Sequence, residues 1–446
     1  MQKNYFGTDG IRDKIGNGLM NPETILKLGW ATGMALKEQN FNDVIIGKDT
    51  RISGYLIESA LESGLVSAGI NIGLLGPMPT PAISYLTSTF RCGAGVVISA
   101  SHNPYYDNGI KVFGHDGFKI SEQIEKKISH YMDQKLQMVA PHKIGKATRI
   151  NGAPDRYIEF CKSKFLSNKS LKGIKIVLDC ANGATYHIAE KVFRELGANV
   201  IVLGNNPDGF NINSGCGSTH LADICEKVKQ SNANIGISFD GDGDRTIMID
   251  EFGNEVDGDS ILYILTKDLY QRKKILNTGV VGTVMTNLAL EKELESMNIP
   301  FTRASVGDKH IMRELNNRNW FLGGEPSGHV LNLKKTNSGD GIITSLLVIN
   351  AMLTQDNSLS DILKGFEKYP QNLIAIPCNN PTSAFNSQKL QEIIKNTDKF
   401  VSKRERILIR ASGTEPKIRL MVEGECRDIV DNITNEIKNK IYEVLK

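Results

Sequence analysis

The sequence contains no Cys-x-x-Cys pair, and its seven cysteines are odd in number. They stand at positions 92, 161, 180, 216, 225, 378 and 426. An odd set without paired spacing argues against a disulfide framework and against a zinc knuckle, and it fits a reducing compartment.

An excess of charge of one sign is also missing. The formal net charge is +3, and the lysines and arginines are scattered along the chain. Without a basic stripe or an RNA-binding aromatic motif, we expect no nucleic-acid partner. No apolar run reaches membrane-spanning length, and the first ten residues, MQKNYFGTDG, have no apolar signal core. We therefore expect a cytoplasmic protein without a membrane partner.

What the chain does contain is enough apolar sequence for several cores. Its 446 residues are 40% hydrophobic and 23% charged, as in ordinary globular proteins. A strand–helix–strand pattern occurs three times, over residues 43–75, 174–204 and 279–305. Strands that alternate with helices predict parallel pairing through right-handed crossovers, and hence three related α/β domains.

The C-terminal part has a different pattern. RILIRASGTEPKIRLMVEG (406–424) predicts two strands around a turn, and residues 427–445 predict a helix. Residues 369–377 have the proline content of a linker. We predict three α/β domains over 1–150, 151–255 and 256–368, followed by a smaller α+β domain over 369–446.

In each of the three repeated domains, an apolar strand leads into a polar loop. The three segments are VVISASHNP (96–104), IGISFDGDGDR (235–245) and WFLGGEPSGH (320–329). Ligands of open α/β sheets bind at the carboxyl ends of the strands. We therefore expect the three loops to converge on one cleft.

The second loop places Asp240, Asp242 and Asp244 on alternate positions, with glycines between them. Carboxylates about 4 Å apart repel by about 4 kcal/mol per pair at an effective dielectric of about 20, so the three together require a cation. The spacing resembles a calcium-binding EF-hand, but Arg245 stands where that loop needs a glycine, and the flanks indicate strands. Three carboxylates suit Mg²⁺, which commonly completes its shell with phosphate oxygen and water.

The first loop offers a serine that could carry such a phosphate. A phosphorylated Ser101 would bring about −1.5 to −2 charge and oxygen ligands to the metal. A serine hydrolase is an alternative, but the loop lacks the Gly-x-Ser-x-Gly pattern. Neighbouring residues of an extended chain point to opposite faces, which predicts that His102 is poorly placed as a base and donates to phosphate instead. From the residues alone, Ser99 remains a rival nucleophile.

Further polar residues fit a ligand that carries phosphate. Glu325, Ser327 and His329 in the third loop suit sugar hydroxyls. Exposed amides, hydroxyls and guanidinium groups form a good anion site, and the C-terminal turn offers them at Arg410, Ser412, Gly413, Thr414 and Arg419. Basic residues also stand in or beside glycine-containing turns at Arg12, Lys48, Arg51 and Lys111. A lysine with a depressed pKa could act as general acid or base, which singles out Lys111.

Taken together and in order, these motifs resemble those of the α-D-phosphohexomutase family. SASHNP, DGDGDR, a Gly-Glu-x-Ser-Gly-His loop and R-x-SGTEP carry the resemblance, which extends over essentially the whole chain. FGTDGIR, GKDTRISG, ASHNPYYDNGIK and DCANGATYHIA resemble the bacterial members that act on glucosamine phosphate. The family implies three α/β/α sandwich domains and a C-terminal domain similar to the TATA-binding-protein fold, around a central cleft.

The resemblance also implies a role for each motif. Ser101 matches the phosphorylated serine, and one Mg²⁺ per subunit would be bound by Asp240, Asp242, Asp244 and the phosphoserine. Glu325 and Ser327 would contact the sugar, with Arg245 and His329 beside them, and the C-terminal turn would hold the phosphate that is not transferred. Lys111, Arg12, His102 and His329 are candidates for proton transfer or phosphate contact.

The reaction implied is the interconversion of glucosamine 6-phosphate and glucosamine 1-phosphate through glucosamine 1,6-bisphosphate, toward UDP-N-acetylglucosamine and cell-wall precursors. The expected partner is a small-molecule sugar phosphate, and a homodimer is compatible with it. The alternatives are a phosphomannomutase or phosphoglucomutase with the same mechanism, a metal-dependent phosphatase with a serine intermediate, and a sugar-phosphate sensor without turnover.

Overall fold

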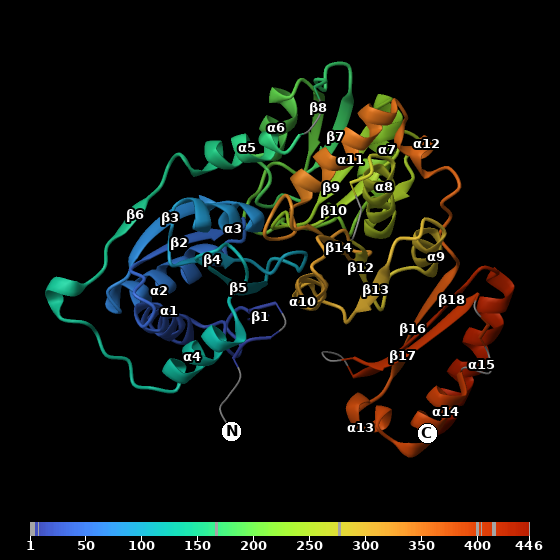
Figure 1. The fold of residues 1–446 in the computed structure, drawn as a ribbon. Coiled ribbons are helices and arrows are strands. Elements are labelled where there is room, and N and C mark those ends of the chain that lie inside the picture. The colour runs from blue at the N-terminus through green and yellow to red at the C-terminus, as the bar shows by residue number, and fades with distance from the viewer. Residues whose placement is uncertain are drawn as a thin grey trace. The chain divides into compact units, whose positions relative to one another are not determined.

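The computed structural model divides into two compact units, one of residues 1–283 with 304–362 and one of residues 284–303 with 363–446. It describes residues 5–7, 9–165, 168–274, 278–397, 401–402, 404–412 and 416–445. Figure 1 labels the helices and strands along the chain. Within the described residues, no helix is both long and apolar enough to cross a membrane.

The first sheet of the larger unit has six strands in the order β1-β5-β4-β2-β3-β6. They are β1 (Ile11–Lys14), β2 (Asp43–Lys48), β3 (Asn71–Pro77), β4 (Ala94–Ile98), β5 (Asp107–Gly114) and β6 (Ala147–Arg149). The helices are α1 (Pro22–Lys37), α2 (Ser53–Ser67), α3 (Thr80–Thr89), α4 (Glu122–Met132) and the short η1 (Pro141–Lys143). α1, α2 and α4 share one core with one face of the sheet, and α3 packs on the other (Figure 1).

The second sheet has the order β11-β10-β9-β7-β8. Its strands are β7 (Lys175–Asp179), β8 (Asn199–Leu203), β9 (Ile235–Phe239), β10 (Thr246–Ile249) and β11 (Glu255–Val256). The accompanying helices are α5 (Ala153–Ser163), α6 (Ala189–Glu195) and α7 (Ala222–Ser231). β9 is buried along its whole length, as expected for a central strand covered on both faces.

A third sheet contains β12 (Val280–Thr283), β14 (Leu322–Gly324) and β15 (Val330–Asn332). Its helices are α8 (Gly258–Gln271), α10 (Asp308–Arg318), α11 (Gly341–Gln355) and α12 (Leu359–Leu363). α11 is buried at its first twelve positions, so it is a core helix rather than a surface helix.

The sheets are mixed, whereas the repeated pattern predicts only parallel pairing. The predicted parallel pairs are present: β2 pairs with β3 and β4, β7 with β8 and β9, and β12 with β14. Each sheet then adds an antiparallel strand directly after the polar loop, as β4–β5, β9–β10 and β14–β15. All three polar loops are therefore hairpin connections, each fixed at both ends by strand hydrogen bonds.

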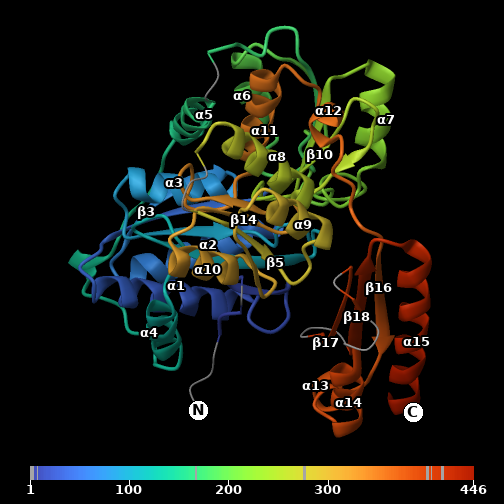
Figure 2. The same cartoon turned by 45° about the vertical axis from the view of Figure 1, so that its right-hand side comes forward.

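The smaller unit is a three-stranded antiparallel sheet in the order β16-β18-β17, covered by helices. It contains β16 (Gln371–Pro377), β17 (Glu405–Ala411), β18 (Lys417–Gly424), α13 (Pro381–Phe385), α14 (Gln388–Asn396) and α15 (Arg427–Leu445). Figure 2 shows α15 running along this sheet, with Val430, Ile433, Ile437 and Ile441 in the shared core. That spacing gives one apolar helix face.

The linker predicted at residues 369–377 is wrong, because residues 371–377 form β16. Proline is tolerated at the ends of an edge strand, and here Pro370 precedes the strand and Pro377 ends it. Between the prolines, Ile374 and Ile376 alternate toward the core. α9 (Leu288–Ser296) also belongs to this unit, and β13 (Phe301–Ala304) follows it. Arg406 donates to the carbonyl of Val284 across 2.8 Å within the unit.

Candidate active site

The serine loop between β4 and β5 has an unusual backbone at Ser101. Its φ is +53°, in the left-handed region that non-glycine residues rarely adopt. The side chain is buried, and the Ser101 amide donates to Oγ of Ser99 across 2.9 Å. Such strain persists only where the surroundings hold the backbone in place.

Arg51 supplies much of that support. Its side chain is fully buried, and its Nε donates to Oδ2 of Asp49 across 2.8 Å. Nη2 donates to the carbonyls of Ser101 and Asn103, at 2.9 and 2.8 Å, and Nη1 donates to the carbonyl of Asp107 at 3.1 Å. A planar guanidinium with five donors can satisfy several loop carbonyls at once. Arg51 is therefore a structural residue of the loop, which its position in a polar turn does not predict.

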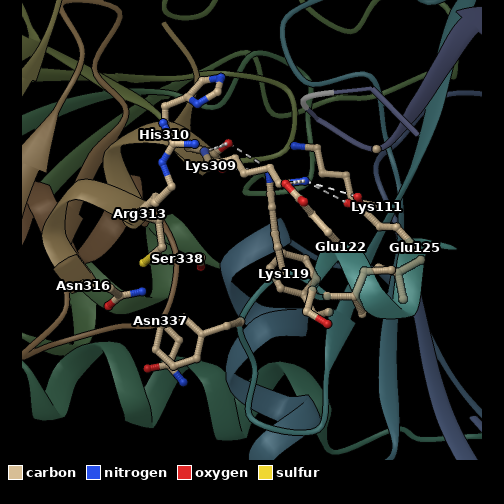
Figure 3. Close-up of a pocket in the computed structure, with 18 of the residues that line it drawn as sticks. Lys111, Lys119, Glu122, Glu125, Lys309, His310, Arg313, Asn316, Asn337 and Ser338 are labelled. Carbon is tan, nitrogen blue, oxygen red and sulfur yellow. Dashed lines mark hydrogen bonds and ion pairs between the residues drawn. The ribbon is translucent and has the colours of Figure 1, made fainter. Parts of the chain in front are cut away.

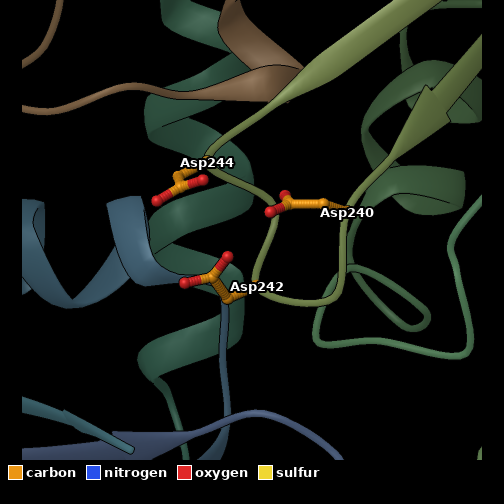
Figure 4. A group of neighbouring side chains, drawn as sticks. All are labelled: Asp240, Asp242 and Asp244. Atoms are coloured by element: carbon orange, nitrogen blue, oxygen red, sulfur yellow. The ribbon is translucent and has the colours of Figure 1, made fainter. Parts of the chain in front are cut away.

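The metal loop between β9 and β10 carries the three aspartates (Figure 4). Asp240, Asp242 and Asp244 are buried, and each offers a carboxylate oxygen within 4.8 Å of those of the others. Oδ1 of Asp242 is buried and accepts no hydrogen bond from a described residue. Three clustered carboxylates and a buried oxygen without a donor fit a hard divalent cation such as Mg²⁺.

Glycine lets this loop approach the serine loop closely. A Cβ atom at Gly241 would lie 2.6 Å from the carbonyl oxygen of Ser101. As a result, Oγ of Ser101 donates to Oδ2 of Asp240 across 2.6 Å. Ser99 faces elsewhere, because its Oγ donates to Oδ2 of Asp49 at 2.6 Å. Of the two candidate nucleophiles, the structure brings Ser101 to the aspartates.

The prediction that His102 and Ser101 point to opposite faces, which made His102 a poorly placed base, is wrong. Its Nδ1 is 3.3 Å from Oγ of Ser101. The alternation of an extended strand does not apply, because the left-handed backbone at Ser101 turns the chain. Burial lowers the pKa of His102 to about 4, and the nearby Arg245 and Arg12 add to the effect. A neutral imidazole at this distance can accept a proton as well as donate one.

Lys111 lies against the metal loop. Its Nζ donates to Oδ2 of Asp242 at 2.9 Å and to Oδ2 of Asp244 at 3.2 Å. Burial alone would lower the pKa of Lys111, but the carboxylates of Asp242, Asp244 and Asp9 raise it well above 10.5. The expectation of a depressed pKa is therefore wrong, and Lys111 is a buried cation that balances the aspartates.

The carboxylates themselves are unequal. Burial raises the pKa of Asp240 well above 3.8, and its neighbours Asp244 and Asp242 add to the rise. Burial acts in the same direction on Asp244, but Lys111 and His329 lower its pKa well below 3.8. Like charges held this close cannot all be equally ionised without a cation.

The third polar loop, between β14 and β15, contains the next three candidates. Glu325 is buried and accepts from the amide of Gly307 at 2.9 Å, while Ser327 lies at 3.5 Å from its second carboxylate oxygen. His329 is buried with Nδ1 at 3.5 Å from Oδ1 of Asp244. Burial opposes protonation, but Asp244 and Asp308 raise the pKa of His329 to about 9.

Two more basic candidates border the aspartates. Arg12 on β1 pairs with Asp9 at 2.7 Å and lies 3.5 Å from Asn103. The amide of Arg245 donates to Asp240 at 3.2 Å, and its Nε is 3.9 Å from Asp244. Asp9, which pairs with Arg12, Lys111 and Lys119, is not among the predicted site residues, although it stands in the quoted FGTDGIR motif.

The C-terminal candidates lie in the smaller unit. Arg410 on β17 is directly opposite Arg419 on β18, and both line a cavity of about 130 Å³. Burial lowers the pKa of Arg410, and the charge of Arg419 lowers it further. Ser412 is buried at the end of the same hairpin. Gly413 and Thr414, predicted to bind phosphate, lie outside the described residues.

Four family models match the chain in order. Those for phosphoglucomutase/phosphomannomutase α/β/α domains I, II and III match residues 3–138, 155–253 and 257–369. The model of the C-terminal domain matches residues 373–440. These matches confirm the predicted fold class of three α/β/α domains and a further C-terminal domain.

Relatives with high identity span nearly the full length. A phosphoglucosamine mutase of Pseudoalteromonas atlantica is 54% identical over 422 residues, 95% of this chain and 94% of the relative. Phosphoglucosamine mutases of Coxiella burnetii and Shewanella piezotolerans are 51% and 50% identical, over 96% and 99% of both chains.

Solved structures share the fold at lower identity. A phosphoglucomutase/phosphomannomutase family protein of Burkholderia thailandensis has a TM-score of 0.81 at 22% identity, over 100% of this chain and 98% of that one. An N-acetylphosphoglucosamine mutase of Aspergillus fumigatus, in complex with GlcNAc-6P and magnesium, has a TM-score of 0.71 at 16% identity. The match covers 99% of this chain and 96% of the Aspergillus fumigatus protein.

Proposed function

The chain belongs to the phosphoglucomutase/phosphomannomutase family, and we propose that it interconverts glucosamine 6-phosphate and glucosamine 1-phosphate. The observation that carries the proposal is the 2.6 Å contact between Oγ of Ser101 and a buried group of three carboxylates. The names of relatives at 50–54% identity support the amino sugar as substrate. The product would supply UDP-N-acetylglucosamine and cell-wall synthesis.

In the proposed reaction, phosphorylated Ser101 donates its phosphoryl group to the free hydroxyl of the sugar phosphate. The bond between phosphorus and Oγ breaks, a bond to the sugar oxygen forms, the hydroxyl loses its proton and Ser101 regains one. Glucosamine 1,6-bisphosphate results, turns around, and returns its other phosphoryl group to Ser101 by the reverse changes. The active site contributes mainly positioning and charge stabilisation to such a transfer.

One Mg²⁺ per subunit, held by Asp240, Asp242, Asp244 and a phosphoryl oxygen on Ser101, would draw charge from the serine oxygen and improve it as a leaving group. Lys111, which donates to Asp242 and Asp244, balances part of the negative charge of the aspartates. Arg12 and Arg245, both within 4 Å of an acidic side chain of the site, are cations that can approach the transferred group.

For proton transfer we propose His102, whose ring nitrogen lies 3.3 Å from Oγ of Ser101 and whose lowered pKa keeps it neutral near pH 7. Lys111, with its raised pKa, would hold its proton and orient the phosphoryl group. Glu325 would accept hydrogen bonds from sugar hydroxyls and Ser327 would donate to them, with His329 beside them. Arg410, Ser412, Gly413, Thr414 and Arg419 would hold the phosphate that is not transferred.

The runner-up function is a phosphomannomutase or phosphoglucomutase, the activities named in the family description. It differs in the sugar and not in the chemistry, so turnover of amino and neutral sugar phosphates separates the two. A phosphatase with a serine intermediate would release inorganic phosphate in proportion to substrate consumed. We also propose the four domains predicted from the sequence, with boundaries after residues 150, 255 and 368, a cytoplasmic location and a homodimer.

The test is intact-mass analysis of the full-length chain before and after incubation with glucosamine 1,6-bisphosphate. We expect the added mass of one phosphoryl group, mapped to Ser101 by peptide analysis. The same preparation should convert glucosamine 6-phosphate to glucosamine 1-phosphate faster than it converts glucose or mannose phosphates. Phosphate on another residue would contradict the assignment of the serine, and faster turnover of a neutral sugar would contradict the substrate.

A further inference from the structure

Six titratable side chains form a closed ring in the larger unit, in which acidic and basic groups alternate. We call this set the charge ring; in order it consists of Asp9, Lys111, Asp244, His329, Asp308 and Lys119. Only Asp244 belongs to the three aspartates of the metal loop. Asp308 and Lys119 are not among the site residues predicted from the sequence, and neither has a role in the reaction proposed above.

The contacts of the ring are short on one side. Nζ of Lys111 lies 3.2 Å from Oδ2 of Asp244 and 3.6 Å from Oδ2 of Asp9. Nζ of Lys119 lies 2.6 Å from Oδ1 of Asp9 and 2.7 Å from Oδ2 of Asp308. Lys119 therefore shares Asp9 with Lys111.

His329 closes the ring on the other side. Its Nε2 lies 3.9 Å from Oδ2 of Asp308, and its Nδ1 lies 3.5 Å from Oδ1 of Asp244. The two carboxylates that contact Lys119 thus also contact the two basic groups that face Asp244: Asp9 contacts Lys111, and Asp308 contacts His329. Lys119 touches none of the three metal-loop aspartates at salt-bridge distance.

The local fold explains why the two lysines share the ring. β5 ends at Gly114, the chain turns through Gly117 at φ +80°, and Lys119 then pairs with Phe113 in an antiparallel bridge. Residues two apart on a strand share a face, as do directly opposite residues of an antiparallel pair. Lys111, Phe113 and Lys119 therefore share one face.

The ring joins parts of the chain that are far apart in the sequence. Asp9, Lys111 and Lys119 lie within the match to domain I, while Asp308 and His329 lie within the match to domain III. Lys111, Lys119 and Asp308 line a cavity of about 610 Å³ between α10 and the segment that leads from β5 into α4. Figure 3 shows Lys119 entering this cavity from one side and Lys309 from α10 on the other.

We infer that Lys119 is a positioning residue for the aspartates of the metal loop. By pairing with Asp9 and Asp308, it stops these carboxylates from drawing Lys111 and His329 away from Asp244. Removing its charge would shift both cations toward the ring's outer carboxylates. The metal loop would then attract a divalent cation more strongly, while Lys111 would be misplaced for phosphoryl transfer.

A simpler role for Lys119 would be to hold the two domains together. A second ion pair already bridges the same two domains, because Nζ of Lys309 on α10 lies 3.2 Å from Oε2 of Glu125 on α4. Glu125 lies outside the charge ring, so Glu125→Gln is a matched control that weakens the bridge between the domains without altering the ring. A purely structural role predicts that the two substitutions act alike.

The experiment measures Mg²⁺ binding to the full-length chain by titration calorimetry. Intact-mass analysis verifies that wild type and variants have the same phosphorylation state at Ser101. We expect Lys119→Met to bind Mg²⁺ about threefold to tenfold more tightly. This is the change in affinity expected when a unit positive charge roughly 10 Å from a divalent ion is removed at high dielectric. Asp308→Asn should bind about threefold to tenfold more weakly, because it removes a negative charge instead. Lys119→Arg and Glu125→Gln should stay within about twofold of wild type.

Turnover provides a second readout, which rests on the proposed reaction, whereas Mg²⁺ binding rests only on the proposed metal site. Lys119→Met should lose at least about tenfold in kcat with little change in KM, and Lys119→Arg should restore it. Weaker or unchanged Mg²⁺ binding by a folded Lys119→Met would overturn the inference, as would a matching effect of Glu125→Gln. If Lys119→Met does not fold, tighter or unchanged binding by Asp308→Asn overturns it. A wild-type chain that binds no Mg²⁺ would overturn the proposed function as well.

Discussion

Oγ of Ser101 lies 2.6 Å from Oδ2 of Asp240, although the two residues belong to different hairpins. The contact needs a left-handed backbone at Ser101 and a glycine at position 241, where a Cβ atom would lie 2.6 Å from the Ser101 carbonyl oxygen. Of the two serines in the SASHNP loop, Ser99 donates its hydroxyl to Asp49, whereas Ser101 places its hydroxyl against the carboxylates. That relationship gives the first prediction.

Ser101→Ala should lower turnover of glucosamine 6-phosphate by at least about 10³-fold, because the phosphoryl acceptor is removed. The melting temperature should stay within a few degrees, since one hydroxyl contact is lost. Turnover and incorporation of a phosphoryl group, read by intact mass, check this. Ser99→Ala is the matched control: it should still take up phosphate, and a protein that loses uptake only with Ser99→Ala would reverse the assignment.

Arg51→Met should destabilise the fold by about 3–5 kcal/mol, because it leaves Asp49 and several loop carbonyls buried without their donor. Denaturant unfolding measures the change in the free energy of unfolding. Arg318→Ala is the control: this half-exposed arginine lies 3.5 Å from Glu314, and its loss should cost less than about 1 kcal/mol. Equal effects of the two substitutions would mean that Arg51 does not support the serine loop.

Stability should fall as pH decreases from about 6.5 to about 4, in part through His187. Burial lowers the pKa of His187 to about 4, and Lys191 adds to the effect. The folded state therefore disfavours the proton that the unfolded state takes up, so this contribution is complete above pH 6.5 and is lost as pH falls through 4. In His187→Gln, the loss of unfolding free energy between pH 7 and pH 4 should be smaller by on the order of 2 kcal/mol. An unchanged pH dependence in the variant would contradict the prediction.

Arg419→Ala should raise KM for the sugar phosphate by about tenfold, with a smaller change in kcat, because Arg419 is proposed to hold the phosphate that does not react. Two guanidinium groups directly opposite each other on β17 and β18 repel, and a bound dianion would relieve the repulsion. Steady-state kinetics on the full chain provide the measurement. Arg404→Ala, at an exposed arginine of the same unit, should leave KM unchanged.

The parts of the site that follow local rules could be predicted from the sequence. A continuous apolar run predicts β4 and β9 as buried strands, and alternate aspartates between glycines predict a cluster of carboxylates. Strand alternation predicts β17 and β18, and apolar spacing predicts α15 with its observed ends. These features depend on residues that are close together in the chain.

The features that the sequence did not reveal depend on tertiary contacts. The contact between His102 and Ser101 follows from a left-handed residue that distant groups hold in place, including the guanidinium of Arg51. The pKa of Lys111 is set by aspartates more than 130 positions along the chain, although burial opposes them. Proline content, a local signal, predicts a linker where β16 lies, because the pairing of β16 with β18 depends on residues far along the chain.

The hairpin arrangement of the three polar loops limits how the protein can respond to its ligand. Each loop is anchored at both ends in a buried sheet, so none can swing open like a lid that hangs from a flexible segment. In the proposed reaction, a bisphosphate that exchanges its two ends would therefore meet the same three anchored loops in both orientations. The exchange would then require rotation of the sugar itself or displacement of whole domains. Time-resolved probes should therefore be attached to the substrate or to separate domains, not to the loops.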